Sequence, residues 1–362
     1  MNSFIKAFIA LLLITFTFAN SNIPVIGVIT NVEPENSADA TKSKIYSSYI
    51  KWIELGGGQA IAIHPWTTDE ELNDIFSKVN GFLLQGGDKD LNLNGQFETF
   101  VGKVVNKIIE YQEQKKVNFP LFAICQGHEL ILLLFSKNKD ILTEFDSRNY
   151  QSPLNFEDSI IKSSRMFSYF SEADFVNLKT KETTAHFHHL GVSVQNFKNY
   201  PLLTKNFLVT SWGVDGNKDP NYVPVESFEG ITYPIYGVQF HPEKVPFDYS
   251  PTDNIPQNPE AIKISFQLAL FFINEARKNN NIFTEVDKKN YDFINLMDGS
   301  FINDGGKMVK FYNKTVIKVI NHNPTSNNVL ILVIIICAIC LLTFLYRHNH
   351  KKDESYDSRS LI

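Results

Sequence analysis

A single cysteine, Cys125, lies where one apolar segment ends and another begins, in the stretch FPLFAICQGHELILLLF (residues 119–135). A strand followed at once by a helix is the arrangement of a nucleophile elbow, and Ala123 and Gly127 supply the small residues that its sharp turn needs. Such a turn places the sulfur at a helix N-terminus, where backbone N–H groups favour the thiolate. The alternative is a cysteine buried in a core strand.

A base for this cysteine is expected in YGVQFHPEK (residues 236–244). His241 ends a predicted strand, and Glu243 can bind the imidazole nitrogen that faces away from the sulfur. A nucleophile, a base and an orienting acid are the three parts of a hydrolytic triad. A histidine before a proline at a strand end is more often structural, so the catalytic hypothesis depends on both motifs together.

Strands and helices that could position these residues alternate along the first half of the chain. Apolar and β-branched runs predict strands over 25–30, 59–64, 81–87 and 119–125, and helical spacing predicts helices over 43–58, 67–79, 97–114 and 258–277. This alternation predicts a mostly parallel sheet with helices on both faces. Sites form beyond the carboxyl ends of such strands, where His64, Gly86, Gly87 and Cys125 fall. Strand-like segments between 185 and 241 predict an added antiparallel element.

Both ends of the chain are apolar. Residues 1–20 contain Lys6 and then an uncharged run, which is the layout of a secretory signal peptide, although a buried first helix has the same composition. Residues 329–346 carry no charge, and a helix of this length rises about 27 Å, close to the thickness of the bilayer core. A core helix is the alternative, but few core helices are apolar on every face. The sequence therefore predicts one C-terminal transmembrane helix.

Basic residues follow this apolar span, so the positive-inside rule predicts a single-pass type I membrane protein with residues 347–362 as a cytosolic tail. Residues 21–278 are then the luminal catalytic domain. Residues 279–328, rich in Asn and Lys, are expected to form a luminal stalk that carries the glycosylation triplet at Asn313. The final residues, DSRSLI, resemble an acidic dileucine sorting signal, which favours a lysosome or vacuole over the cell surface.

The remaining cysteines and the net charge exclude several kinds of protein. Cys337 and Cys340 lie in the apolar span, where they are small apolar residues or, less simply, palmitoylation sites. Cys125 is therefore alone in the luminal portion and has no partner for an intrachain disulfide. The formal net charge is −5, with no basic run before the C-terminus, which argues against nucleic acid as a partner.

Three histidines, His186, His188 and His189, raise the question of a metal site, because alternate residues of a strand share one face. No further cysteine or carboxylate stands at ligand spacing. We therefore expect these side chains to contact substrate or to serve the structure, and we expect neither a metal nor a cofactor.

The segments AICQGHE (123–129) and QFHPEK (239–244) resemble the class I glutamine amidotransferase superfamily. Within it, residues 23–277 are similar to the γ-glutamyl hydrolase family, with further matches in SSYIKWIELGGGQAIAI, NGFLLQGGDKDL and AHFHHLGVSVQNF. The resemblance implies a flavodoxin-like three-layer α/β sandwich. It also implies an omega peptidase that trims folate poly-γ-glutamates, working as a homodimer.

The resemblance assigns Cys125 as nucleophile, His241 as general base and acid, and Glu243 as the residue that orients the histidine. It also implies that Glu129 and His188 hold the γ-glutamyl substrate. From the elbow itself we expect the backbone N–H groups of Gln126 and Gly87 to bind the oxyanion. At lysosomal pH, a cysteine paired with a protonated histidine is expected to remain a thiolate.

Two departures from the family pattern concern residues next to the site. Gln85 precedes the glycine pair where proline is more usual, and Gln126 and His128 replace apolar residues after the nucleophile. Both leave the backbone donors unchanged and bear on substrate preference.

Two other classes of function compete with hydrolysis. A synthetic amidotransferase would need a second, ATP-dependent domain, which does not follow residue 277, and a non-catalytic receptor on this fold has no need of the thiol or the histidine. Hydrolysis of γ-glutamyl peptides other than folates remains an alternative within the same chemistry.

Overall fold

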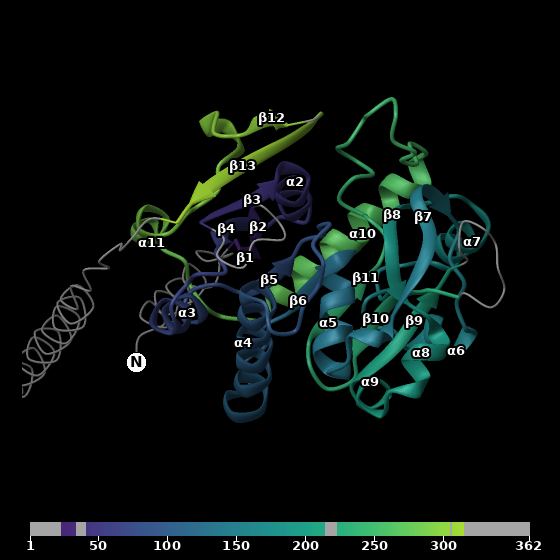
Figure 1. Cartoon of the computed structure of the whole chain (residues 1–362). Helices are drawn as coiled ribbons and strands as arrows, with labels where there is room; N and C mark the ends of the chain where they lie inside the picture. The colour runs from purple at the N-terminus through teal and green to yellow at the C-terminus, as the bar shows by residue number, and fades with distance from the viewer. Residues whose placement is uncertain (1–22, 34–40, 214–222, 305, 315–362) are drawn as a thin grey trace, which may run out of the picture. The chain divides into compact units, whose positions relative to one another are not determined.

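The computed structural model describes residues 23–33, 41–213, 223–304 and 306–314 (Figure 1). The predicted signal peptide (1–20), transmembrane helix (329–346) and cytosolic tail (347–362) lie outside these ranges. Within them, no helix is both long enough and apolar enough to cross a membrane. The described residues therefore comprise the expected catalytic domain and the segment directly after it.

The central feature is a seven-stranded, mostly parallel sheet. Its strands, in spatial order, are β4 (Gln59–Ile63), β1 (Val25–Ile29), β5 (Gly81–Leu84), β6 (Leu121–Ile124), β11 (Ile235–Val238), β10 (Val225–Gly230) and β9 (Phe207–Trp212). The first five strands are parallel, and β10 runs antiparallel to both of its neighbours. The mixed α/β sheet expected from the alternating pattern is thus confirmed.

Helices cover both faces of this sheet, because successive residues of each central strand point to opposite faces and both sets are apolar. In β6, Leu121 and Ala123 belong to one buried cluster, whereas Phe122 and Ile124 belong to the other. The first cluster includes residues of α3 (Asp69–Phe76), α4 (Gln96–Glu110) and α5 (Gln126–Ser136), and the second includes residues of α2 (Ser47–Leu55), α7 (Glu172–Thr180) and α10 (Pro259–Ala276). Near-continuous burial of each strand is what a sheet covered on both faces requires.

Two smaller sheets flank the main one. β7 (Leu142–Ser152) and β8 (Thr184–Val192) form an antiparallel ribbon, drawn in teal in Figure 1, which is the added antiparallel element that the sequence predicts. The short elements near it are α6 (Asp158–Ser163), α8 (Val194–Asn199), α9 (Pro201–Asn206) and the 3₁₀ turn η2 (Lys139–Ile141). A π-helical turn, η1 (Tyr111–Lys115), extends α4.

The second small sheet contains residues that the sequence predicts to be helical. Its order is β12 (Ile302–Asp304), β13 (Lys307–Asn313), β3 (Lys42–Tyr46) and β2 (Asn31–Glu33). A helix is expected over 43–58, but its first residues form β3, and the helix begins at Ser47. The apparent helical spacing of Ile45 reflects burial in a strand, because β3 pairs with β2 and with distant β13.

The prediction of a stalk is wrong for residues 279–314, whereas residues 315–328 lie outside the described ranges. This segment contains α11 (Glu285–Asn290), the turn η3 (Leu296–Asp298) and the hairpin β12–β13, and it belongs to the same compact unit as the sheet. Its asparagines bind backbone groups: Asn281 donates to the carbonyls of Phe76 (2.8 Å) and Val79 (2.9 Å). The polar composition therefore serves attachment to the domain.

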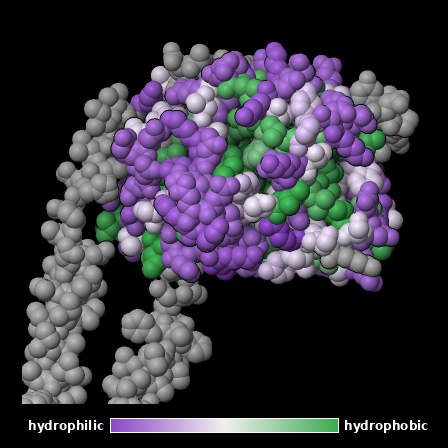
Figure 2. Space-filling view, turned by 90° about the horizontal axis from the view of Figure 1, so that it is seen from below, coloured by the Kyte–Doolittle hydropathy of each residue, from purple (hydrophilic) through white to green (hydrophobic). Residues whose placement is uncertain are grey.

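The surface is mixed. Figure 2, which views the molecule from below, shows a broad hydrophilic area beside a part where hydrophobic residues gather. Among the described residues, exposed large hydrophobic side chains include Val176 in α7, Ile231 in the turn after β10 and Met297 in η3. Scattered exposure of this kind is normal for a globular protein.

Candidate active site

Cys125 occupies a strained turn between β6 and α5. Its backbone angles are φ 52° and ψ −113°, outside the regions that a non-glycine residue ordinarily adopts. Its N–H donates to the Val238 carbonyl (2.8 Å), and its carbonyl accepts from the Glu129 N–H (3.1 Å). A Cβ at Gly127 would lie 2.7 Å from the Leu84 carbonyl oxygen, so only glycine fits beside the turn. These features are those of the predicted nucleophile elbow.

His241 follows β11, the strand next to β6. Its N–H donates to the Ala185 carbonyl (2.8 Å), and its ring Nδ1 lies 2.7 Å from Glu243 Oε1. Burial alone would raise the pKa of the Glu243 carboxyl, but the imidazole beside it holds that pKa below its usual value. An ionised Glu243 accepts a hydrogen bond from the Nδ1–H of His241, which leaves Nε2 as the nitrogen free to act as a base.

Gly86 stands between the cysteine and the histidine. A Cβ placed on it would lie 3.0 Å from His241 Cε1 and 3.1 Å from Cys125 Cβ, so both side chains border the same small space. The Gly86 N–H donates to the Tyr49 hydroxyl (2.8 Å), and its carbonyl accepts from Asn31 Nδ2 (2.6 Å). The glycine turn is thereby held in one position relative to the thiol.

The sequence does not single out Tyr49 and Asn31 as site residues. Tyr49 lies on the predicted apolar face of a helix and reads as a core residue, and it is 3% exposed. Burial, and next the Glu243 carboxylate, raise the pKa of Tyr49 well above its usual value, so its hydroxyl stays protonated. For Tyr49, the only signal in the sequence is the polar hydroxyl of a residue on an otherwise apolar helical face.

The two expected oxyanion donors lie near the sulfur. The Gln126 N–H donates to the Cys125 sulfur, and Gly87 lines the pocket beside it. A Cβ on Gly87 would lie 2.8 Å from both Asn31 Nδ2 and Gln126 Oε1. The Gln126 side chain turns away and donates to the Lys89 carbonyl (2.6 Å), which explains how a glutamine fits after the nucleophile.

The surroundings of the Cys125 thiol set its resting state. Burial, followed by the carboxylates of Glu129 and Glu243, raises the pKa of Cys125 well above its usual value. The helix N–H of Gln126 offsets only part of this effect. The unliganded site therefore favours a neutral thiol.

The two expected substrate residues, Glu129 and His188, lie behind the pocket wall and do not line it. Glu129 accepts a hydrogen bond from Gln239 Nε2 (2.9 Å), and burial raises its pKa to about 8. His188 donates from Nδ1 to the Leu190 carbonyl (2.8 Å), and burial lowers its pKa to about 4. Both are neutral near pH 7, and neither is placed to meet a substrate directly.

The histidine cluster has a partner that the sequence does not reveal. His186 and His188 share one face of β8 as expected, with Nδ1 of the first 3.4 Å from Nε2 of the second. Glu226, from β10, brings Oε2 to 3.6 Å from His186 Nδ1. Potential ligand atoms of these three buried residues lie within 4.8 Å of one another. A carboxylate therefore does lie close to these histidines, although none stands at ligand spacing in the sequence.

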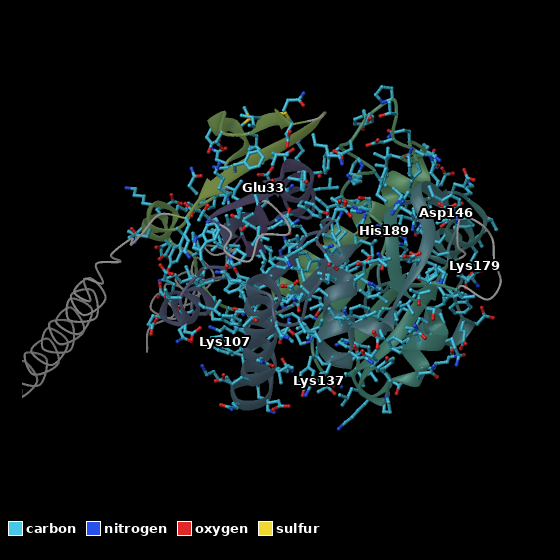
Figure 3. All side chains as sticks on the ribbon, viewed as in Figure 1. Glu33, Lys107, Lys137, Asp146, Lys179 and His189 are labelled. Carbon is cyan, nitrogen blue, oxygen red and sulfur yellow. The ribbon has the colours of Figure 1, made fainter. Side chains whose placement is uncertain are left out.

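This cluster also has a full set of protein contacts around His186. Its Nε2 lies 2.9 Å from the Ser152 hydroxyl and 2.8 Å from that of Thr184, and burial raises the pKa of Glu226 to about 8. Two imidazoles and a carboxylate suit Zn²⁺, and a protonated Glu226 suits a neutral cluster, in which its Oε2 has no hydrogen-bond partner among the described residues. His189, next to His188 in the strand, belongs to the opposite face of β8 and lines the pocket. Figure 3 labels it beside β8.

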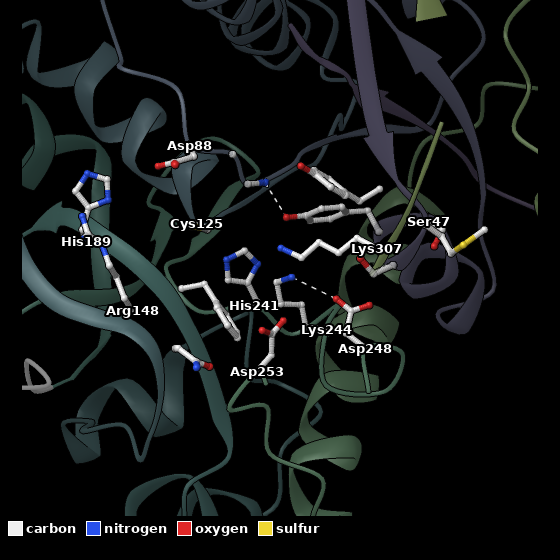
Figure 4. A pocket seen from close by; sticks show the side chains of 18 residues that line it. Ser47, Asp88, Cys125, Arg148, His189, His241, Lys244, Asp248, Asp253 and Lys307 are labelled. Carbon is white, nitrogen blue, oxygen red and sulfur yellow. Dashed lines mark hydrogen bonds and ion pairs between the residues drawn. The ribbon is translucent and has the colours of Figure 1, made fainter. Parts of the chain in front are cut away.

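An open pocket of about 480 Å³ contains Cys125 and His241 in its lining (Figure 4). Cys125 and His241 lie at its floor with Gly86 and Gly87, and the walls come from the start of α2, the β7–β8 ribbon and β13. The pocket can admit an extended polar chain to a buried thiol and its base.

His64 does not line this pocket. Its ring binds the Thr30 and Ser43 hydroxyls and Asp292, so it connects structural elements.

Comparisons with known proteins agree with one another. The family model described as Peptidase C26 matches residues 24–243. The gamma-glutamyl hydrolase of Mus musculus is 35% identical over 272 residues, covering 75% of this chain and 83% of that protein. The Homo sapiens gamma-glutamyl hydrolase is 33% identical, covering 72% and 80%. Gamma-glutamyl hydrolase B of Dictyostelium discoideum is 32% identical, covering 73% and 75%.

Proposed function

The chain belongs to the peptidase C26 family, and from this premise we propose that it is a cysteine hydrolase that cleaves the γ-glutamyl amide bonds of folate poly-γ-glutamates. The family resemblance noted in the sequence is confirmed by relatives that carry the name gamma-glutamyl hydrolase. One observation carries the mechanism: a thiol on a strained elbow and a histidine bound to an ionised carboxylate border the same glycine.

In the proposed reaction, His241 takes the Cys125 proton as the sulfur attacks the amide carbonyl. The N–H groups of Gln126 and Gly87 bind the oxyanion, each contributing roughly 2.7–4 kcal/mol at the transition state. When the tetrahedral intermediate collapses, His241 gives its proton to the departing amine and a thioester remains. A water deprotonated by the same imidazole then releases the glutamyl product and restores the thiol. Glu243 holds the ring in the orientation that both steps need.

The neutral resting thiol fits this sequence of steps. Burial disfavours a standing thiolate, so proton transfer and attack are coupled through His241. Glu129 and His188 support the site from behind the wall. The Gln239 amide fixes the position of the Glu129 carboxyl.

The proposal also covers the fold family, the membrane anchor and the cellular compartment. The order β4-β1-β5-β6-β11 supports a flavodoxin-like three-layer sandwich, with the site beyond the strand ends. The uncharged run 329–346 and the basic residues after it support a type I anchor, with the enzyme in a lysosome or vacuole or at the cell surface. Asn313, exposed at the end of β13, supports N-glycosylation there. A homodimer is proposed from the family resemblance alone.

The test uses the full chain in detergent. It is incubated at pH 5 and pH 7 with a folate penta-γ-glutamate, beside a Cys125→Ala variant, and products are separated by chromatography. We expect shortened folates from the native protein and a loss of at least about 1000-fold in the variant. A folded native protein that releases nothing from this substrate, but cleaves other γ-glutamyl peptides, would refute the folate assignment and retain the chemistry.

A further inference from the structure

The hairpin β12–β13, expected to be part of a stalk, forms one wall of the pocket. Lys307 and Met308, the first residues of β13, line the pocket beside the reactive groups. β13 pairs with β3, with Val309 opposite Tyr46, and β3 leads directly into the first turn of α2. That turn contains Tyr49, which binds the Gly86 N–H. The hairpin is thus attached to the same backbone that positions the catalytic floor.

Lys307 contributes an ammonium group to the pocket lining. Among the described residues, its ammonium forms neither a hydrogen bond nor an ion pair within 4.0 Å. The neighbouring Lys244 differs, because its Nζ lies 3.3 Å from Asp248 Oδ2 and 5.2 Å from the Phe187 ring centroid. Asp88 and Asp253 add negative charge elsewhere in the lining.

The environment of Lys307 favours the arrival of an anion. Desolvation, and next the positive charge of Lys244, lower the pKa of Lys307, and Asp253 and Asp248 offset this only in part. A cation beside a second cation is stabilised when a carboxylate binds to it. Figure 4 shows the Lys307 side chain extending toward His241, with Arg148 and His189 on the opposite side of the pocket.

We propose that Lys307 is a specificity residue that binds the α-carboxylate of a glutamyl residue next to the scissile bond. Every γ-linked glutamate keeps a free α-carboxylate, because its amide is made by the side-chain carboxyl. A lysine meets such a group as a mobile point charge, which suits a chain whose carboxylates recur at each residue. This proposal rests on the proposed γ-glutamyl hydrolysis and adds to it the group that the enzyme recognises.

The test compares two substrates and three variants of the full chain. One substrate is a folate di-γ-glutamate, and the other is the same molecule with its glutamyl α-carboxylates converted to carboxamides. We expect Lys307→Gln to raise KM for the carboxylate substrate about 10-fold with little change in kcat, and Lys307→Arg to restore most of the affinity. For the carboxamide substrate, the difference in KM between wild type and Lys307→Gln should disappear.

Lys310→Gln is the matched control, because Lys310 lies on the same strand but pairs with Asp298 (3.4 Å) and does not line the pocket. An equal rise in KM for both substrates would assign Lys307 a structural role and overturn the inference. An unchanged KM for the carboxylate substrate would overturn it too. Failure of the wild type to cleave either substrate would instead refute the proposed function, so the two failures are distinguishable.

Discussion

The two sides of the pocket are built in different ways. On the catalytic side, Cys125 and His241 are 3% and 5% exposed. Short hydrogen bonds fix the His241 ring to Glu243 and the Gly86 N–H to Tyr49. On the hairpin side, Met308 is 41% exposed, and Lys307 reaches the pocket from a strand at the surface. Bond breaking needs groups held within a fraction of an ångström in a poorly solvated space. Recognition of a charged chain needs only a cation that can move to meet it.

The largest effect should come from the catalytic side. A Gly86→Ala variant introduces a Cβ at 3.0 Å from His241 Cε1 and 3.1 Å from Cys125 Cβ, so the two reactive groups must separate. Contacts this short require the neighbouring side chains to shift by a few tenths of an ångström. We expect kcat to fall, by up to about 100-fold, with KM little changed, because misplacing reacting groups by about 1 Å costs about that factor. Steady-state kinetics on the folate substrate measures it.

Gly102→Ala provides the control, since a Cβ there meets only Leu134 Cδ2, at 3.8 Å. It should retain wild-type kinetics. Near-normal turnover by Gly86→Ala would mean that the catalytic side tolerates displacement as readily as the hairpin side, and the contrast between the two would fail.

A second prediction concerns the low polarity of the catalytic side. Burial raises the pKa of Glu129 to about 8 from an ordinary value of 4.5. The native chain thus holds a proton that the unfolded chain releases. The contribution of Glu129 to stability is complete below pH 4.5 and is lost as the pH rises through 8. Glu129→Gln, which mimics the protonated form, should therefore gain roughly 3 kcal/mol over wild type between pH 5 and pH 8.

Urea denaturation at several pH values measures this difference. Glu70→Gln, at an exposed helical position, should show a flat difference over the same range. If the curve for Glu129→Gln is also flat, the region behind Cys125 is better solvated than its burial indicates.

The smallest effect should come from the hairpin. Val309 is fully buried and anchors β13 against β3, and Val309→Ala should cost about 1 kcal/mol of stability. Hydrogen exchange should quicken in residues 302–313 and remain unchanged in β6 and β11. We expect KM for long poly-γ-glutamates to rise while kcat stays constant. A fall in kcat instead would show that the two sides of the pocket are coupled.

The sequence predicts the catalytic side well because its signals are local. Ala123, Cys125 and Gly127 form the elbow within five residues, and His241 and Glu243 are two residues apart. Small residues around the turn and an acid beside the base are requirements of the backbone and of the imidazole, and both can be recognised without knowing the distant contacts. The same holds for the buried strands, whose apolar runs need no partner to be identified.

The rest depends on contacts between distant residues. β13 shows no clean alternation, since Val309 is fully buried whereas Phe311, two residues later on the same face, is 38% exposed, and its partner β3 lies some 260 positions earlier. Glu226 reaches His186 because β10 and β8 meet in space, which no spacing in the sequence reveals. Tyr49 gains its role from Gly86 in the same way. Segments rich in Asn and Lys, which suggest a stalk by composition, can equally supply hydrogen bonds to a folded domain.

At Cys125, the stability of the fold and the need for a nucleophile favour different residues. A non-glycine residue held at φ 52° and ψ −113° costs of order 1–3 kcal/mol of folding free energy. Glycine at this position would relieve most of that strain and make the protein more stable, but without a nucleophile. Any screen of variants for thermal tolerance alone should therefore drift toward loss of the thiol. Retention of a cysteine in this conformation can be maintained only by a demand for activity.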